Sequence, residues 1–353
     1  MPPAIWKPSL MVYKIAVKCF TYNHASFIRD AMDGFCMQET DFPYVCIVVD
    51  DASTDGEQEV IRQYLSEHFD LENEVTRNEE TDDYLLTFTR HKTNLNCFFA
   101  VLFLKYNHYR KKAKAPYIQR WVENVPFLAF CEGDDYWTDS SKLRKQVGFL
   151  ENHEEYIVCS HDYLSFYQQD QMMATKSTYA DLWAEGRPEY VDYSLDNYFE
   201  RWWNQPLTCV YRNCACLDQM PRHLYENFRD DIFFYYVLKE GKGALLSDIM
   251  GVYRVHDAGV WSSNDNIQKN KLGYRNAYAI YRNEGDDRAI TRMDRELFRM
   301  VTVLLNRHCF GKAFKEVSGY WSAVPHKFFF AFAAKLNAWF LAKIKRHLGF
   351  REG

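Results

Sequence analysis

Three short apolar runs, each ending in polar residues, constrain the fold of this chain more than any other feature. The runs are Tyr13–Cys19, Val45–Val49 and Phe127–Cys131, and a pair of adjacent aspartates follows the second and the third. Unbroken apolar runs of this length are typical of strands buried on both faces, as in a parallel sheet. Because ligands of such sheets bind at the carboxyl ends of the strands, we expect a functional site where these runs end.

Stretches with helical spacing separate the runs. Phe27–Met37 and Glu57–Phe69 carry apolar residues near the i, i+3 and i+4 positions of a helix, and residues 96–109 and 140–150 show a helical pattern too. Strands that alternate with helices predict βαβ units. We therefore expect an α/β fold, doubly wound around a mostly parallel central sheet.

The chain of 353 residues is long enough for two domains. Residues 156–253 mix short strands with a helix at 231–239, whereas the pattern beyond residue 264 is helical throughout. The sequence therefore predicts one domain at 1–264 and a helical C-terminal region at 265–353.

The last helical stretch, 327–346, is apolar on most of its circumference, but Lys335 and Asn337 interrupt it. A helix that spans a bilayer needs about 20 consecutive apolar residues, so spanning is not expected. The basic residues that follow favour peripheral contact with an anionic membrane. Packing of this helix against the body of the protein is an equal alternative.

Composition limits the classes of binding partner and the cellular compartment that we expect for this protein. The net charge of -5 gives no support for a nucleic-acid partner, which would favour a basic surface. The ten cysteines stand mostly in apolar runs without a CxxC pair, and residues 1–10 contain no long apolar segment typical of a signal peptide. A reducing, cytoplasmic location is therefore the expectation.

The motifs of dinucleotide-binding folds, P-loop NTPases, zincins and α/β-hydrolases are missing, so these classes are not leading hypotheses. What remains are the pairs Asp50–Asp51 and Asp134–Asp135. Adjacent carboxylates repel each other unless a cation or hydrogen-bond donors share their charge, and Mg²⁺ and Mn²⁺ prefer oxygen ligands. Either pair alone also fits a solvated turn, but two pairs at strand ends favour a divalent metal site.

Seven motifs follow one another along residues 12–263. They are FTYNH at 20–24, VVDDASTD at 48–55, EGDDYW at 132–137, KLRKQ at 142–146, LTCVYR at 207–212, RDD at 229–231 before Gly241, and YRVH at 253–256 before Gly259 and Ser262. Together and in this order, they resemble the motifs of family 2 glycosyltransferases with the GT-A fold. The resemblance is closest to bacterial enzymes that build capsule, O-antigen or exopolysaccharide units.

The resemblance implies a donor site for a nucleoside-diphosphate sugar, most simply a UDP-sugar. Tyr22 would stack on the base and Asp51 would accept its imide N–H, while Asp135 and His256 would hold Mn²⁺ or Mg²⁺. A packed or surface histidine is an equal alternative for His256. The implied nucleotide-sugar-binding residues are Thr21, Tyr22, Asn23, Asp50, Asp51, Asn94 and Asp134.

The resemblance also implies inverting transfer of a hexosyl group, with Asp230 as the base that takes the proton of the acceptor hydroxyl. Asp231 competes for this role, because neighbours on a helix point about 100° apart and only one can face the sugar. The acceptor would be a growing glycan or lipid-linked saccharide at the cytoplasmic face of the inner membrane. The implied acceptor-side residues are Trp137, Thr208, Arg212 and Arg254. Core packing of Trp137 and structural bracing by Arg254 are alternatives that the sequence leaves open.

The chain departs from the family pattern in two places. The sequence Asn94-Leu95-Asn96 stands where the family usually has Asn-x-Gly, and residues 107–126 resemble an insertion with a basic run at Arg110, Lys111, Lys112 and Lys114. A solvated loop and a contact with an anionic acceptor or lipid are both open for this run. Two other functions also stay open: a sugar nucleotidyltransferase, and a non-catalytic protein that binds nucleotide or glycan.

Overall fold

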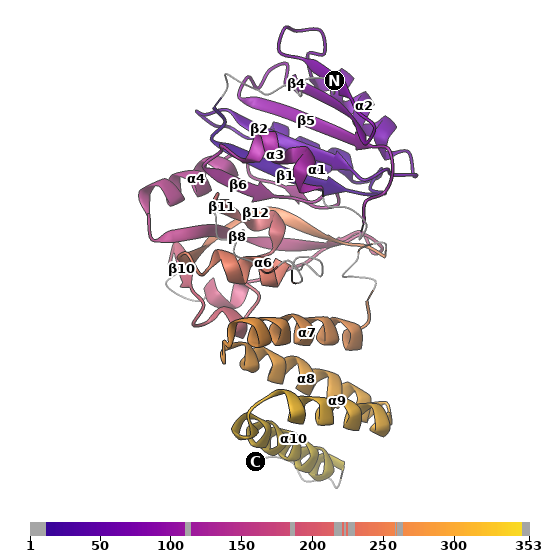
Figure 1. Cartoon of the computed structure of the whole chain (residues 1–353), viewed down its shortest axis with the longest axis vertical. Helices are drawn as coiled ribbons and strands as arrows, with labels where there is room; N and C mark the ends of the chain where they lie inside the picture. The colour runs from indigo at the N-terminus through magenta and orange to yellow at the C-terminus, as the bar shows by residue number, and fades with distance from the viewer. Residues whose placement is uncertain are drawn as a thin grey trace. The chain divides into compact units, whose positions relative to one another are not determined.

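The computed structural model of the chain describes residues 12–109, 114–183, 188–214, 221, 224, 230–257, 259 and 264–347. Two compact units make up the structure (Figure 1). The first extends to His256, and the second takes in Asp196–Arg201 together with the chain from Asp257 onward.

The first unit is built on one mixed sheet whose centre is parallel, with the order β6-β1-β2-β5. These strands are β1 (Ile15–Thr21), β2 (Tyr44–Asp50), β5 (Cys97–Leu104) and β6 (Phe127–Phe130). Thr21 pairs with Asp50, and Asp50 pairs with Phe103. The register therefore brings the carboxyl ends of three strands to one edge of the sheet, as the apolar runs predicted.

Mostly antiparallel strands flank this centre, in the full order β10-β12-β8-β11-β6-β1-β2-β5-β4-β3. The small strands β7 and β9 pair with β12 and β8, and β8 and β12 are parallel to each other. The flanking strands are β3 (Arg77–Glu80), β4 (Tyr84–Arg90), β7 (Tyr136–Trp137), β8 (Tyr156–Tyr167), β9 (Met172–Met173), β10 (Tyr190–Tyr193), β11 (Val210–Arg212) and β12 (Lys242–Val255).

Helices cover both faces of the central sheet, so the expectation of a doubly wound α/β fold is confirmed. On one face, α1 (Ile28–Cys36), α2 (Glu57–His68) and α4 (Lys142–Asn152) share a single apolar core with alternate residues of β1, β2 and β5. On the other face, Phe233 of α6 (Asp230–Val237) contacts Phe130, and α3 (Ala115–Val122) packs against β2.

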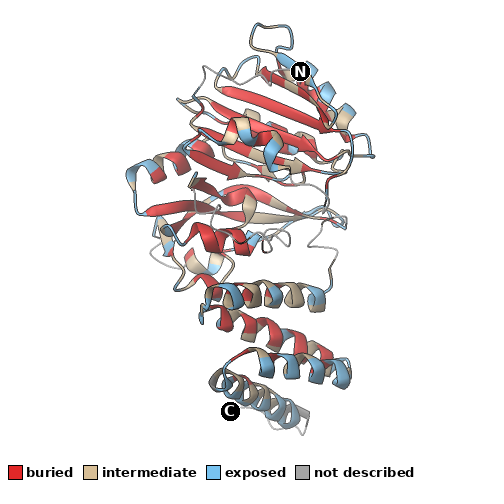
Figure 2. Ribbon diagram, viewed as in Figure 1, coloured by how far each residue is buried: buried red, intermediate tan, exposed pale blue. Residues whose placement is uncertain are grey.

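The helix expected at 96–109 is wrong, because most of this segment is strand β5. Every residue of Cys97–Leu104 is buried, as is every residue of β2 beside it (Figure 2). A run of eight apolar residues has no polar face, which suits a central strand covered by helices on both sides. The length of the apolar run was a better criterion than its pattern, because buried strands typically have 4–8 residues whereas helices have 10 or more.

The second unit contains the predicted helical C-terminal region. Its helices are α7 (Asn266–Glu284), α8 (Ala289–Asn306), α9 (Phe310–Ala323) and α10 (His326–His347), and α8 contacts each of the other three. Buried residues of α8 at helical spacing, including Met293, Leu297 and Leu304, form the centre of this core. Within the described residues, no helix combines the length and the apolar character needed to cross a membrane.

Three short 3-10 segments complete the described structure, at Ala180–Trp183, Tyr198–Glu200 and Pro206–Thr208.

Candidate functional site

The acidic turn 132–135, between β6 and β7, crosses the carboxyl end of β1. The backbone N–H of Gly133 donates to the Phe20 carbonyl oxygen over 3.3 Å. A Cβ atom at Gly133 would lie 2.1 Å from Thr21 Oγ1, a distance that no side chain tolerates. Glycine is thus required here, and the close approach brings Asp134 next to the loop that follows β1.

Asp134 meets two histidines in this position. His256 Nε2 lies 3.0 Å from Asp134 Oδ2, and His24 Nε2 lies 3.8 Å from the same oxygen. One ligand atom from each of the three residues falls within 4.8 Å of the others. The carboxylate comes from the β6–β7 turn and the imidazoles from the loop after β1 and the end of β12, so the cluster joins distant parts of the chain.

The cluster fits a divalent cation. Asp134 Oδ1 is buried without a hydrogen-bond partner among the described residues, so one carboxylate oxygen still lacks a donor or cation. Burial alone would raise the pKa of Asp134, but the hydrogen bond to His256 and the charges of His24 and His256 hold it below its ordinary value. A carboxylate and two imidazoles form a common ligand set for first-row divalent metals.

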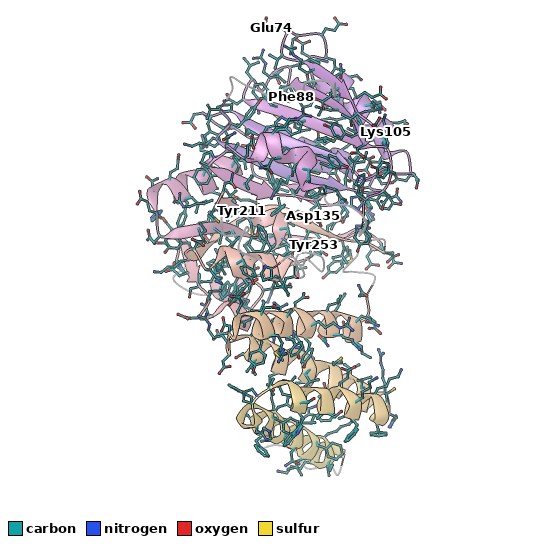
Figure 3. The ribbon with its side chains drawn as sticks, in the orientation of Figure 1. Glu74, Phe88, Lys105, Asp135, Tyr211 and Tyr253 are labelled. Carbon is teal, nitrogen blue, oxygen red and sulfur yellow. The ribbon has the colours of Figure 1, made fainter. Side chains whose placement is uncertain are left out.

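Asp135 is turned away from this cluster. Its Oδ1 accepts the Arg254 backbone N–H over 2.8 Å, and the residue is buried. Burial and the charge of Asp134 raise the pKa of Asp135 well above its ordinary value. Burial, followed by the charge of Asp135, also raises the pKa of Tyr253 on β12. Both residues are labelled in Figure 3. The geometry therefore favours Asp134 over Asp135 as a metal ligand, and the assignment to Asp135 stays a prediction.

Arg254 braces the acidic turn. Its Nε donates to the Asp134 carbonyl oxygen over 2.9 Å, and its two terminal nitrogens donate to Gln168 Oε1 over 2.6 Å and to Asp30 Oδ2 over 2.5 Å. The side chain is largely buried. The guanidinium is therefore committed to protein oxygens, and we assign it a structural role in place of the expected contact with the acceptor.

Glu57, at the start of α2, ties together the loops after β1 and β2. Its carboxylate accepts the Thr21 hydroxyl, the His24 backbone N–H over 2.9 Å and the Ser53 hydroxyl over 2.7 Å. In the same loops, Asn23 (φ 58°) and Ala52 (φ 59°) adopt the left-handed conformation that non-glycine residues rarely occupy. This network fixes the position of His24, while the Tyr22 side chain is 43% exposed beside it.

Asp50 ends β2 and is fully buried. Its Oδ1 accepts from Gln58 Nε2 over 2.5 Å and from the Ser53 backbone N–H over 3.2 Å, whereas Oδ2 has no partner among the described residues. Burial raises the pKa of this carboxyl. Asp50 therefore has one oxygen left for a ligand group.

Asp51 has both oxygens engaged by the 107–126 insertion. The His108 backbone N–H donates to Oδ1 over 2.8 Å, and Lys114 Nζ donates to Oδ2 over 2.6 Å. Asn107 Nδ2 also donates to the Asp51 carbonyl oxygen over 3.0 Å. Lys114 is thus no solvated loop residue, whereas Arg110, Lys111 and Lys112 lie outside the described residues.

Asp230 and Asp231 begin α6 and differ in burial. Asp230 is exposed and Asp231 is buried. Desolvation within the acidic turn and the charges of Asp134 and Asp230 raise the pKa of Glu132. Asp230 therefore acts electrostatically on the acidic turn and is the more exposed of the two residues.

Two expected site residues lie at the opposite edge of the sheet. Asn94 precedes β5 and its Nδ2 donates to Tyr44 Oη over 3.0 Å, at the start of β2. Arg212 pairs with Phe127, the first residue of β6, and its Nε donates to the Tyr156 carbonyl oxygen. The seven residues of β2 span roughly 20 Å, so neither side chain belongs to the site at the carboxyl ends.

Two other expected acceptor-side residues are buried in the fold. Trp137 Nε1 donates to the Leu207 carbonyl oxygen over 2.8 Å, and its ring packs edge-on against Phe35. Thr208 Oγ1 donates to the Gln205 carbonyl oxygen over 2.8 Å. Both residues support the core and do not line the site.

The structure also adds residues that the sequence reasoning did not assign to the site: His24, Glu57, Lys114 and Glu132. His24 and Glu132 stand inside motifs already recognised, so their position was a usable signal. Lys114 stands in the basic run already noted, but its partner Asp51 was not predictable, and Glu57 carries no sequence signal, because only the folded loops bring these residues to Asp51 and Thr21. Arg229 and Ser262, which belong to the quoted motifs, lie outside the described residues.

Comparison with known proteins bears on this site. Residues 19–85 match the family model described as glycosyl transferase family 2. Over 253 residues, the chain is 30% identical to the uncharacterized proteins Mb1547 of Mycobacterium bovis and Rv1520 of Mycobacterium tuberculosis. The match covers 70% of this chain and 61% of each relative, so the chain spans about three fifths of their length.

Two solved structures share the fold. One is S. aureus TarS 1–349 in complex with UDP-GlcNAc, with a TM-score of 0.58 and 17% identity over 95% of this chain and 92% of that one. The other is the mannosyltransferase PcManGT from Pyrobaculum calidifontis in complex with GDP-Man and Mn²⁺, with a TM-score of 0.50 and 14% identity over 99% and 86%.

Proposed function

We propose that this protein transfers a hexosyl group from a nucleoside-diphosphate sugar to a hydroxyl group, because residues 19–85 match the model of glycosyl transferase family 2 and the fold is GT-A. The observation that supports this most is the convergence of His24, Asp134 and His256 at the carboxyl ends of the central strands. Asp230 adds an accessible carboxylate whose charge reaches the same turn.

The three clustered residues would hold a divalent cation. When bound, such a cation neutralises the charge that develops on the departing diphosphate. Two imidazoles beside one carboxylate favour Mn²⁺ over Mg²⁺, because Mg²⁺ selects oxygen ligands almost exclusively. The complex of the mannosyltransferase neighbour with Mn²⁺ is in line with this preference.

The donor is most simply a UDP-sugar. Tyr22 is exposed and available for stacking on a base. Asp51 can accept the imide N–H of uracil once Lys114 gives up Oδ2, and Asp50 Oδ2 has no hydrogen-bond partner within the described part of the chain. The complex of the TarS neighbour with UDP-GlcNAc supports this choice of nucleotide.

Asp230 is the residue that would take the proton of the acceptor hydroxyl as that oxygen attacks the sugar. It is exposed at the first turn of α6, whereas Asp231 is buried. An attack from the face opposite the diphosphate inverts the anomeric centre in one displacement. Proton transfer to a positioned carboxylate of this kind contributes about 10²–10⁴-fold to the rate.

We further propose that the acceptor is a growing surface glycan or lipid-linked saccharide and that transfer takes place at the cytoplasmic face of the inner membrane. The support is the resemblance to capsule, O-antigen and exopolysaccharide enzymes together with the basic aromatic C-terminal helices.

A panel of nucleotide sugars, assayed for Mn²⁺-dependent donor hydrolysis and transfer, tests the function. We expect release of the nucleoside diphosphate from one donor and a loss of about 10²–10⁴-fold in kcat for Asp230→Asn with UDP affinity retained. Asp231→Asn is the matched control and should lower stability while the folded protein keeps its turnover. Release of pyrophosphate would identify a nucleotidyltransferase, and UDP binding without turnover by the wild type would identify a non-catalytic protein.

A further inference from the structure

The exposed face of α9 carries a stripe of aromatic residues. Phe310 is 59% exposed, Phe314 is 75% exposed and Trp321 is 40% exposed. Their spacing of four and seven residues puts all three on one side of the helix. Ala313 and Tyr320 of the same helix are buried. The helix therefore packs with the side that carries these two residues and leaves the rings of Phe310, Phe314 and Trp321 exposed to solvent.

Helix α10 exposes a second stripe. Phe330, Leu341 and Ile344 are 62%, 51% and 42% exposed, and their spacing of 11 and three residues again matches one side of a helix. Phe332, by contrast, is buried and contacts Tyr320 of α9. The rings of Trp321 and Phe330 lie 5.9 Å apart edge to face, so the two stripes join into one apolar surface.

The segment that contains α9 and α10 is strongly basic in sequence. Residues 310–353 contain eight Lys and Arg but only two Glu, in a chain whose net charge is -5. Lys335 and Lys343 lie against α8, since their ammonium groups bond Asp294 and Asn306. Lys315 and Lys345 are exposed and extend the positive charge beside the apolar stripes, whereas the exposed Lys312 lies on the opposite side of α9 from its aromatic stripe.

We propose that the joined stripes of α9 and α10 are a docking surface for an anionic lipid bilayer, with the rings inserted at the headgroup boundary and the lysines facing the lipid phosphates. Aromatic residues favour this boundary, and each cation near an anionic surface contributes about 1 kcal/mol. A second copy of the chain fits less well, because pairing two such surfaces brings like charges together.

This inference rests on the membrane location in the proposed function but not on the transfer chemistry. Lipid binding is therefore measured on the full chain without nucleotide sugar, by co-sedimentation with vesicles of equal parts phosphatidylglycerol and phosphatidylcholine. The same preparations are tested for Mn²⁺-dependent UDP binding. Binding to lipid without binding to UDP would support the docking surface and contradict the proposed donor site. Binding to UDP without binding to lipid would do the opposite.

We expect the wild type to partition onto these vesicles, and the double variant Phe314→Ser/Phe330→Ser to lose at least tenfold in partition coefficient with unchanged thermal unfolding. The double variant Lys315→Glu/Lys345→Glu should lose the preference for anionic over pure phosphatidylcholine vesicles. Met172→Ser removes an apolar side chain that is 60% exposed in the first unit and is the control without effect.

Three results would overturn the proposal. One is equal partition of the wild type and the Phe double variant. Another is no binding of the wild type to either vesicle. The third is a concentration-dependent dimer that the Phe substitutions abolish while lipid binding persists, since this would assign the surface to a second copy of the chain.

Discussion

His256 Nε2 lies 3.0 Å from Asp134 Oδ2, although 122 residues separate them in the chain. The contact joins the end of β12 to the turn after β6 and directs the His256 imidazole toward the Asp134 carboxylate. The other oxygen of this carboxylate, Oδ1, has no hydrogen-bond partner among the described residues. The contact between His256 and Asp134 is the geometric basis of the proposed cation site.

Asp134→Asn, His256→Ala and His24→Ala should each weaken Mn²⁺ binding by at least tenfold, because each removes one of three converging ligands. Isothermal titration of the protein with Mn²⁺ alone, without nucleotide, measures the effect. His153→Ala is the control, since this histidine bonds the Phe149 carbonyl oxygen away from the site. Unchanged Mn²⁺ affinity in His24→Ala would reduce the site to Asp134 and His256.

Lys114→Met should raise the affinity for UDP roughly fivefold, because the imide N–H of uracil and the Lys114 ammonium compete for Asp51 Oδ2 and a partly exposed ion pair stabilises by about 1 kcal/mol. Affinity for CDP should not change, since cytosine has no imide N–H. Lys105→Met, which breaks the exposed pair with Glu80, is the matched control. A fall in UDP affinity would mean that Lys114 itself contacts the nucleotide.

Gly133→Ala should lower the free energy of unfolding by about 1–3 kcal/mol, because the added methyl group would overlap Thr21 Oγ1 and push the acidic turn off the end of β1. Mn²⁺ binding should fall with it. Gly148→Ala, in the interior of α4 where a Cβ meets nothing within 4 Å, should instead stabilise by about 0.5–1 kcal/mol. Chemical denaturation of both variants provides the comparison, and equal stability of the two would refute the steric argument.

Lys18 predicts a pH dependence of stability. Its ammonium lies 2.6 Å from Tyr211 Oη and 3.9 Å from the centre of the Phe130 ring, and burial lowers its pKa from 10.5 to about 7. Between these two values the unfolded chain holds the proton and the native state does not, so this group's contribution to stability rises with pH.

The free energy of unfolding of the wild type, measured relative to that of Lys18→Met, should therefore increase by about 1.4 kcal/mol per pH unit from pH 7 upward. Denaturation midpoints at several pH values measure the slope. Lys176→Met, at an exposed position, should run parallel to the wild type. A parallel course for Lys18→Met as well would show that the native and unfolded states share one Lys18 pKa.

The central sheet was predictable from the sequence because a strand buried on both faces needs an unbroken apolar run, and Val45–Val49 and Phe127–Cys131 are such runs. The same reasoning failed at Cys97–Leu104, where apolar continuity fits a buried helix and a buried strand alike. Parallel pairing with β2 decides that case, and pairing partners are not written in the local sequence.

The amino-acid sequence by itself determined that carboxylates would gather at the strand ends, since the polar residues directly follow the apolar runs. Only the tertiary structure decided which of them face one another. Asp134 and Asp135 are neighbours in sequence, yet one meets His24 and His256 while the other accepts the Arg254 backbone N–H. Adjacent side chains in extended or turn backbone point in different directions, and the surrounding fold selects the one that faces the site.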